Sequence, residues 1–257
     1  KNQNITKNTK NLDQRWLRRI QLLGKFNIRS LLKAEIKNIE NTEKGSSLSE
    51  YLIAGARQLS SNGNYLESFK VIYNSLRRKD ILFSKNVLGV LFPKPFLKEL
   101  SKTDINFDPI IALSLIRQES GFNRTARSRV GARGLMQLMP NTAKQFKRNI
   151  KKSHLFNPKV NLSIGTKYLQ GLLSRYDNNL VLSLAAYNAG EGRVDKWKDR
   201  YLNTDSILHN IENIPFNETR KYVKLIFRNI NFTFIYNIKH YLIIYFCDGY
   251  ILIVRIG

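Results

Sequence analysis

Apolar residues recur at helical spacing through most of this 257-residue chain, and no other feature restricts its fold as strongly. The pattern covers Trp16–Leu23 and Leu31–Ile36, with basic residues between the apolar positions. Tyr51–Leu76 predicts a helical hairpin, because two amphipathic runs flank the turn residues Ser60–Asn64. The sequence therefore predicts a mainly α-helical protein, with further helices over 109–120, 141–148, 162–176, 180–187 and 218–230.

The segment Leu91–Phe96 interrupts this pattern with two prolines, so we expect a linker that runs to about residue 104. The linker separates an N-terminal helical region over 1–103 from a second helical domain over 104–236, and an apolar tail follows over 237–257. The tail has Asp248-Gly249 at its centre, which favours a β-hairpin over a membrane-spanning helix. A tail packed on the domain, or an irregular end, is the alternative.

One helix of the second domain has clear signals at both ends. Asp108 can cap its start, Pro109 suits the first helical position, and Gly121 can end it. The residues between are apolar almost all round, which indicates a buried helix. A polar side chain near its end therefore needs a reason to be there.

That side chain is Glu119, the only acidic residue between positions 109 and 176, where there are 13 Lys and Arg. Burial and the helix dipole would raise the pKa of Glu119 and keep it protonated near neutrality, as a general acid requires. The neighbouring Arg117, Arg124 and Arg127 would lower it. The residues alone leave two interpretations open, a general acid or an ion pair with one of these arginines.

Two later segments combine small residues with hydrogen-bonding side chains. Within Ser128–Pro140, glycines allow close backbone approach to a ligand, and Gln137 offers a donor and an acceptor to sugar hydroxyls or acetamides. Within Ala185–Gly190, a tyrosine hydroxyl and an asparagine amide stand at a helix end. The structural alternatives are a tight turn with buried methionines and an ordinary helix terminus.

Four motifs together resemble the soluble lytic transglycosylases, the goose-type-lysozyme-like SLT class of glycoside hydrolase family 23. They are IRQESGFN (116–123), SRVGARGLMQLMP (128–140), AAYNAGEGRV (185–194) and ENIPFNETRKYV (212–223), and the match covers about residues 104–236. Glu191 departs from the proline that is common at its position. The resemblance implies a lysozyme-like α-helical catalytic domain, preceded by a short remnant of the family's helical superstructure.

The resemblance also assigns roles by position. It implies that Glu119 is the single catalytic acid/base, and that the glycan site is lined by Ser128, Gln137, Met139, Tyr187, Asn188, Ala189, Glu212 and Tyr222.

The implied activity is cleavage of the β-1,4 bond between N-acetylmuramic acid and N-acetylglucosamine in peptidoglycan. Glu119 would protonate the glycosidic oxygen while the muramoyl acetamido carbonyl stabilises C1. The same carboxylate would then deprotonate the 6-hydroxyl, which closes a 1,6-anhydro ring. No cofactor is expected, and the location implied is periplasmic or otherwise extracytoplasmic in a bacterium. A hydrolytic lysozyme on the same fold, or a scaffold that binds glycan without cutting it, is the alternative.

The charge balance, 43 Lys and Arg against 19 Asp and Glu, gives a net +24 that would attract polyanions. Peptidoglycan strands are the expected partner, with membrane or wall-surface association through the basic charge. A nucleic-acid-binding protein is a less favoured alternative, because no such motif is present and aromatic residues are not interleaved with the basic runs. Biased A/T-rich codon usage is the other explanation for the lysine excess.

Cysteine and histidine chemistry is not expected. Cys247 is the single cysteine, and His154, His209 and His240 lie far apart, so the sequence has no metal-ligand pattern and no intramolecular disulfide. No cleavable leader is visible, and Lys1 in place of a methionine indicates a processed or truncated product.

Overall fold

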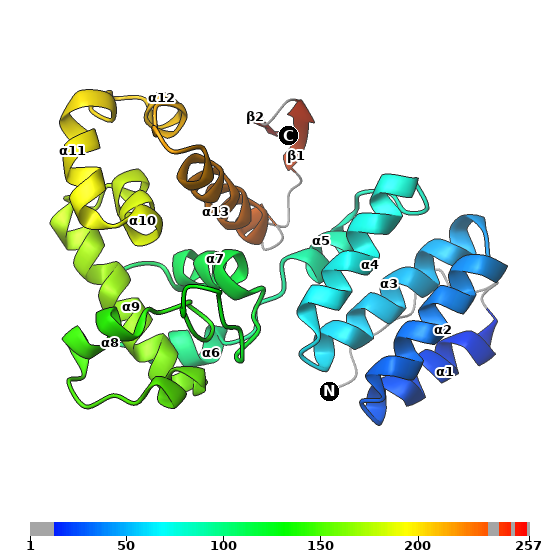
Figure 1. Cartoon of the computed structure of the whole chain (residues 1–257). Helices are drawn as coiled ribbons and strands as arrows, with labels where there is room; N and C mark the ends of the chain where they lie inside the picture. The colour runs from blue at the N-terminus through cyan, green and yellow to red at the C-terminus, as the bar shows by residue number, and fades with distance from the viewer. Residues whose placement is uncertain (1–12, 236–241, 248–249, 256–257) are drawn as a thin grey trace. The chain divides into compact units, whose positions relative to one another are not determined.

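Two helical units make up the chain, residues 1–93 and 94–257, in a computed structural model that describes residues 13–235, 242–247 and 250–255 (Figure 1). The prediction of a mainly α-helical fold is confirmed. The first unit contains five helices among its described residues, α1 (Gln14–Lys25), α2 (Arg29–Thr42), α3 (Gly45–Ser61), α4 (Tyr65–Arg78) and α5 (Lys85–Leu91).

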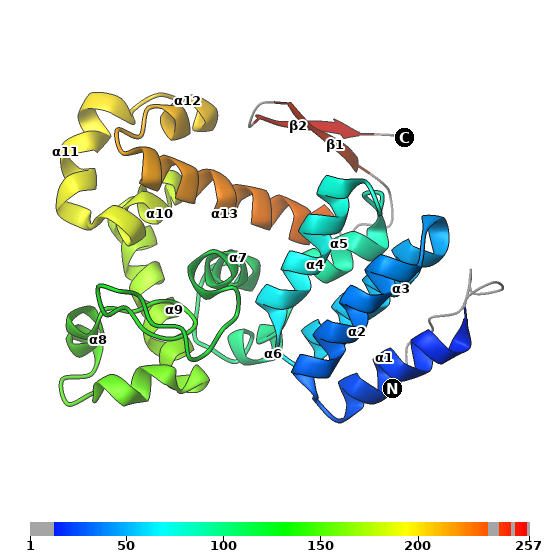
Figure 2. The same cartoon turned by 45° about the vertical axis from the view of Figure 1, so that its right-hand side comes forward.

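Neighbouring helices of the first unit pack closely where their side chains are small. α3 and α4 form a hairpin around residues 62–64, and the buried Ser68 hydroxyl donates to the Ala56 carbonyl across it at 2.7 Å. A Cβ at Gly55 would lie only 2.8 Å from Ile36 Cγ1, so the glycine allows α3 to approach α2. Figure 2 shows α1, α2, α3 and α4 lying side by side in this unit.

The second unit is built around a buried central helix, α7, which spans Pro109–Ser120. Its other helices are α6 (Leu97–Leu100), α8 (Pro140–Phe146), the 3-10 helix η1 (Lys152–Phe156), α9 (Pro158–Arg175), α10 (Leu180–Ala189), α11 (Glu191–Tyr201), α12 (Ile207–Glu212) and α13 (Asn217–Ile235). α13 packs along α7, and α10 contacts both α9 and α13.

The two ends of α7 match their sequence signals. The Asp108 side chain accepts the Ile110 amide hydrogen bond at 2.8 Å, and Gly121 ends the helix with a φ of 56°. Leu115 and Ile116 on the same helix are fully buried. Because both ends of α7 are fixed, Glu119 is held in the last turn of a helix that the rest of the unit surrounds.

The division between the units falls ten residues before the expected boundary at 103/104, after Pro93. The segment expected to be a linker contains α6, which packs against α7, and Leu100 on it is fully buried. Helices α11 and α12 were also not expected. Their sequences are polar or short, so the helical pattern of apolar residues is weak there. The two helices are stabilised by packing on α10 and α13.

Two strands follow the helices, β1 (Leu242–Cys247) and β2 (Tyr250–Arg255), and they pair antiparallel with Cys247 opposite Tyr250. The Asp248-Gly249 turn expected from the sequence lies outside the described residues.

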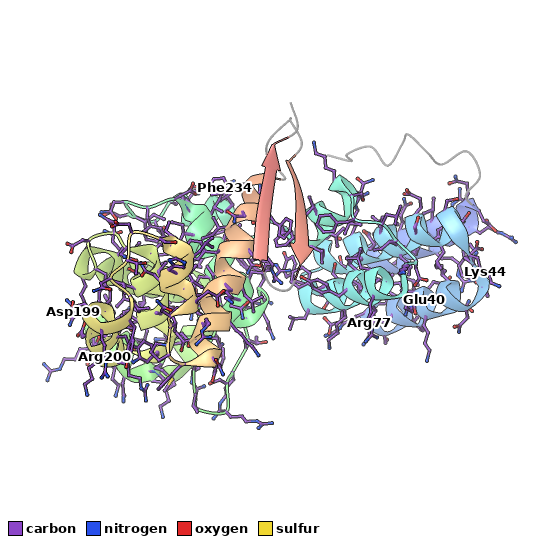
Figure 3. The ribbon with its side chains drawn as sticks, turned by 90° about the horizontal axis from the view of Figure 1, so that it is seen from above. Glu40, Lys44, Arg77, Asp199, Arg200 and Phe234 are labelled. Atoms are coloured by element: carbon purple, nitrogen blue, oxygen red, sulfur yellow. The ribbon has the colours of Figure 1, made fainter. Side chains whose placement is uncertain are left out.

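Charged side chains cover the surface of each unit. Figure 3 shows Glu40 and Arg77 projecting from helices of the first unit, and Asp199 and Arg200 from the end of α11. Within the described residues, none of the helices combines the length and apolar character needed to span a bilayer.

Candidate active site

Glu119 is held by a tyrosine from a distant part of the chain. The Tyr222 hydroxyl on α13 donates to Glu119 Oε1 across a 2.5 Å separation, although 103 residues separate the two in sequence. Among the described residues Glu119 forms no ion pair with a Lys or Arg side chain. Arg117, the nearest candidate in sequence, donates instead to Asn229 Oδ1 at 3.2 Å. The alternative of a glutamate–arginine pair therefore does not describe this carboxyl.

Burial controls the protonation of Glu119. It raises the pKa of this carboxyl from its usual 4.5 to about 7, and the hydrogen bond from Tyr222 offsets part of that rise. At neutral pH the side chain is therefore divided between its protonated and ionised forms. Because Oε1 accepts from Tyr222, a proton on the carboxyl is placed on Oε2, where it can be donated to another molecule.

Two tyrosines lie close to this carboxyl, and a third packs against one of them. Burial and the charge of Glu119 raise the pKa values of Tyr187 and Tyr222 well above their usual range, so both hydroxyls keep their protons. The ring of Tyr168 on α9 lies 5.1 Å from that of Tyr187, centroid to centroid, and burial raises the pKa of Tyr168 to about 12. Within the described ranges, the site thus offers neutral hydrogen-bonding groups and no compensating cation beside Glu119.

The irregular segment after α7 supplies backbone groups to the same site. The Tyr187 hydroxyl donates to the Met136 carbonyl at 2.8 Å, which joins α10 to this segment. Gln137 adopts a φ of 45°, and its side-chain Nε2 donates to the carbonyls of Gly134 and Ala126 at 2.8 and 3.2 Å. The donor side of Gln137 is therefore used within the protein, and its Oε1 is the atom left to meet a ligand.

Residues 98–210 match the family model described as "Transglycosylase SLT domain". This part of the chain is similar to the SLT family of transglycosylase domains. The resemblance expected from the four sequence motifs is thereby confirmed.

Relatives of the SLT domain are lytic transglycosylases by name. The chain is 42% identical over 119 residues to the soluble lytic murein transglycosylase of Escherichia coli K12, a match that covers 44% of this chain and 18% of the relative. It is 41% identical over 126 residues to a putative soluble lytic murein transglycosylase of Haemophilus influenzae, covering 47% and 21%. The chain thus spans about a fifth of the length of these relatives.

Solved structures share the fold over more of the chain. The 70 kDa soluble lytic transglycosylase of Escherichia coli superposes with a TM-score of 0.66 and 29% identity, over 90% of this chain and 37% of that one. An inactive mutant of the lytic transglycosylase Slt from Pseudomonas aeruginosa superposes with a TM-score of 0.64 and 30% identity, covering 85% and 36%. A third structure with a TM-score of 0.64 is the 70 kDa enzyme in complex with bulgecin A.

The second unit brings some of the expected site residues together. Tyr222 contacts Glu119 directly, Tyr187 lies close enough for the charge of Glu119 to raise its pKa, and Gln137 follows the carbonyl that Tyr187 holds. Asn188 accepts a hydrogen bond from Thr219 Oγ1 at 2.8 Å, so it ties α10 to α13 one turn before Tyr222.

Other expected site residues have different contacts. Glu212 forms a partly exposed ion pair at 2.6 Å with Lys224, which lies on the helix that also carries Tyr222. Ser128 Oγ accepts from the Ala132 amide at 3.0 Å within its own turn. The remaining two differ in exposure, with Ala189 buried and Met139 exposed.

Sequence reasoning missed Tyr168 and Thr219, because each acts on the site through another residue. The Tyr168 ring packs against that of Tyr187 at an angle of 44°, and the Thr219 hydroxyl donates to the side-chain oxygen of Asn188. A signal for Thr219 was present, since it lies one helical turn before Tyr222 and therefore shares its face of α13. The SLT domain offers no metal site either: among the residues that the structure describes, no group of three His, Cys, Asp or Glu is placed to hold an ion.

Proposed function

We propose that this chain is a peptidoglycan lytic transglycosylase that cleaves the β-1,4 bond between N-acetylmuramic acid and N-acetylglucosamine and leaves 1,6-anhydromuramoyl ends. The observation that carries the proposal is Glu119, a carboxyl without a cationic partner, whose pKa of about 7 suits both an acid and a base at neutral pH. The similarity to the SLT family supplies the substrate class, and the names of its relatives support it.

The first step uses the protonated carboxyl. Glu119 donates the Oε2 proton to the glycosidic oxygen, and the N-acetylglucosamine leaves. The muramoyl acetamido carbonyl stabilises the positive charge at C1, so a second enzymic carboxylate is not needed. Tyr222 hydrogen-bonds the carboxylate that remains and stabilises its charge.

The second step uses the ionised carboxyl. Glu119 removes the proton of the muramoyl 6-hydroxyl, whose oxygen attacks C1 and closes the anhydro ring. The proton lost in the first step is thereby recovered, and no water is consumed.

The Tyr187 hydroxyl is not expected to donate to the acetamido carbonyl of the substrate. Its proton is directed at the Met136 carbonyl, so the hydroxyl oxygen is available as an acceptor. We assign it to the acetamido N–H of the muramoyl residue, an interaction that also turns the acetamido carbonyl towards C1. Gln137 Oε1 and the Asn188 amide are proposed to bind neighbouring sugar groups, and an extracytoplasmic location follows from a peptidoglycan substrate.

The experiment is digestion of purified peptidoglycan followed by mass analysis of the released muropeptides. A transglycosylase yields products lighter by one water than those of a hydrolase, so the hydrolytic alternative is decided by the same measurement. Glu119→Gln serves as the matched inactive control, and calorimetric binding of bulgecin A, the ligand of a structural relative, reports whether that variant keeps its site. Reducing muramoyl ends instead of anhydro ends would assign the chain to the hydrolases.

A further inference from the structure

The segment that holds Tyr187 is itself anchored by one buried side chain. Asn161, on the first turn of α9, has no exposed surface, and each of its two side-chain polar atoms is used. Its Oδ1 accepts from the Met136 amide at 2.8 Å, and its Nδ2 donates to the carbonyls of Arg133 and Leu155 at 3.0 and 2.8 Å. A single amide group therefore fixes the main chain at two points of the segment 133–137.

Two glycines allow this close approach. A Cβ at Gly134, which has a φ of 76°, would lie 2.4 Å from Asn161 Nδ2 and 2.2 Å from the Leu155 carbonyl oxygen. A Cβ at Gly165 would lie 2.3 Å from Met136 Sδ. Since Asn161 and Gly165 are four residues apart, they share a face of α9, where one binds the main chain of Met136 and the other receives its side chain.

From these contacts we infer that Asn161 is a positioning residue for catalysis, acting through the Met136 carbonyl on the hydroxyl of Tyr187. The inference rests on the proposed function, because Tyr187 is the group that orients the muramoyl acetamide there. The chain of contacts is continuous: Asn161 holds the Met136 amide, and the carbonyl of the same residue accepts from Tyr187.

Loss of Asn161 has a defined physical consequence. Gly134 and Gln137 both have positive φ values, 76° and 45°, and Gln137 is a residue type that rarely adopts one. Such a backbone persists only where the surrounding structure fixes it. Without Asn161 the Met136 carbonyl moves, and a displacement of about 1 Å at a reacting group lowers turnover by about 100-fold.

The test compares two buried asparagines with matched hydrogen bonding. Asn210 on α12 also makes three hydrogen bonds to a neighbouring segment, accepting from Thr204 N and Oγ1 at 3.1 and 2.9 Å and donating to Thr204 O at 2.8 Å. We expect Asn161→Ala to lower kcat between about 10-fold and about 100-fold with little change in KM. Asn210→Ala should lower the melting temperature comparably and leave kcat unchanged. Equal kcat in the two variants would overturn the inference.

A double-mutant cycle tests the route through Tyr187. If Asn161 acts through the Tyr187 hydroxyl, Asn161→Ala adds no further loss to Tyr187→Phe, whereas independent effects multiply. Fully multiplicative losses would overturn the proposed route. Gly165→Ala provides a second variant that removes no hydrogen bond and displaces Met136. It should also lower kcat without raising KM, and wild-type kcat in this variant would count against the inference.

Amide hydrogen exchange gives a readout that does not require activity. Asn161→Ala should remove exchange protection from residues 133–138 and leave 204–210 protected, while Asn210→Ala should do the reverse. Unchanged protection over 133–138 would overturn the anchoring role even if the chain cuts peptidoglycan. If the wild-type chain releases no muropeptides, the proposed function fails, and hydrogen exchange still decides whether Asn161 fixes this segment.

Discussion

Each unit of the protein has a glutamate whose carboxyl is largely shielded from solvent on a helix, and the two carboxyls have different partners. Glu35 in the first unit is 6% exposed and lies 2.7 Å from the Arg19 guanidinium, which also stacks over the Trp16 ring. Glu119 in the second unit has the hydroxyl of Tyr222 as its one hydrogen-bonding partner among the residues that the structure describes. Over the described part of the chain, the same residue type therefore lies beside a cation in one unit and beside a tyrosine hydroxyl in the other.

The partner of each carboxyl determines whether it can take part in proton transfer. A cation favours the ionised form and offsets the cost of burial. A tyrosine hydroxyl offsets that cost only in part, so the pKa of Glu119 stays raised to about 7 and its proton is available for transfer. The first unit contains two further glutamate–arginine ion pairs, Glu67 with Arg29 and Glu40 with Arg78.

The largest expected effect is on turnover. Glu119→Gln should lower peptidoglycan cleavage by at least about 100-fold, since general acid–base catalysis contributes about 10²–10⁴-fold. Glu35→Gln, the matched change in the first unit, should leave kcat unaltered and lower the melting temperature, because it removes the partner of Arg19. Residual activity of Glu119→Gln above a hundredth of wild type, measured by muropeptide release, would contradict the general-acid role.

The same pair of variants should move stability in opposite directions at alkaline pH. Between pH 4.5 and about 7 folded Glu119 binds more protons than the unfolded chain, so its contribution to stability is present below pH 4.5 and lost as the pH rises through 7. The rise of the Glu119 pKa from 4.5 to about 7 on folding corresponds to a loss of stability on the order of 3 kcal/mol at pH 8, where the carboxyl is ionised.

Thermal unfolding at two pH values measures this cost. Glu119→Gln should melt higher than wild type at pH 8 and lose that advantage at pH 4, whereas Glu35→Gln should melt lower than wild type at pH 8. A Glu119→Gln variant that is no more stable at pH 8 than at pH 4, relative to wild type, would show that this carboxyl is compensated after all.

A smaller effect is expected from Tyr222→Phe. The hydrogen bond from Tyr222 lowers the pKa of Glu119, so its loss raises that pKa further. Because the acid must be protonated, the alkaline limb of the pH profile of kcat/KM should shift to higher pH, while kcat falls less than in Glu119→Gln. An unshifted limb would mean that the titration reported by kcat/KM belongs to another group.

The smallest effect concerns ionic strength. Positive charges dominate the sequence from 109 to 176, with 13 Lys and Arg around the single Glu119. If they attract an acidic wall polymer, kcat/KM should fall several-fold as salt rises from about 50 to about 300 mM, because the Debye length shortens to below about 8 Å. The kcat should change little, because it reports the reaction of substrate that is already bound. A kcat/KM independent of salt would leave codon usage as the explanation of the lysine excess.

Much of the local architecture could be predicted from the sequence. Asp108 and Gly121 mark the ends of α7 because capping depends on residues within one turn, and the turn after Ser60 likewise follows from residues beside it. The helix α11 could not be predicted in this way. Its residues are mostly charged, and it is stable because Val194 and Trp197 are buried against the rest of the unit.

The sequence by itself determined that a lone carboxyl, Glu119, ends a buried helix, since composition and capping are local properties. Only the tertiary structure decided what that carboxyl meets. It placed Tyr222, 103 residues away in sequence, beside Glu119 and Arg117 beside Asn229. The sequence alone was also compatible with an ion pair between Glu119 and an arginine. The physical reason is that a pKa depends on every group within a few ångströms, and helix packing decides which groups those are.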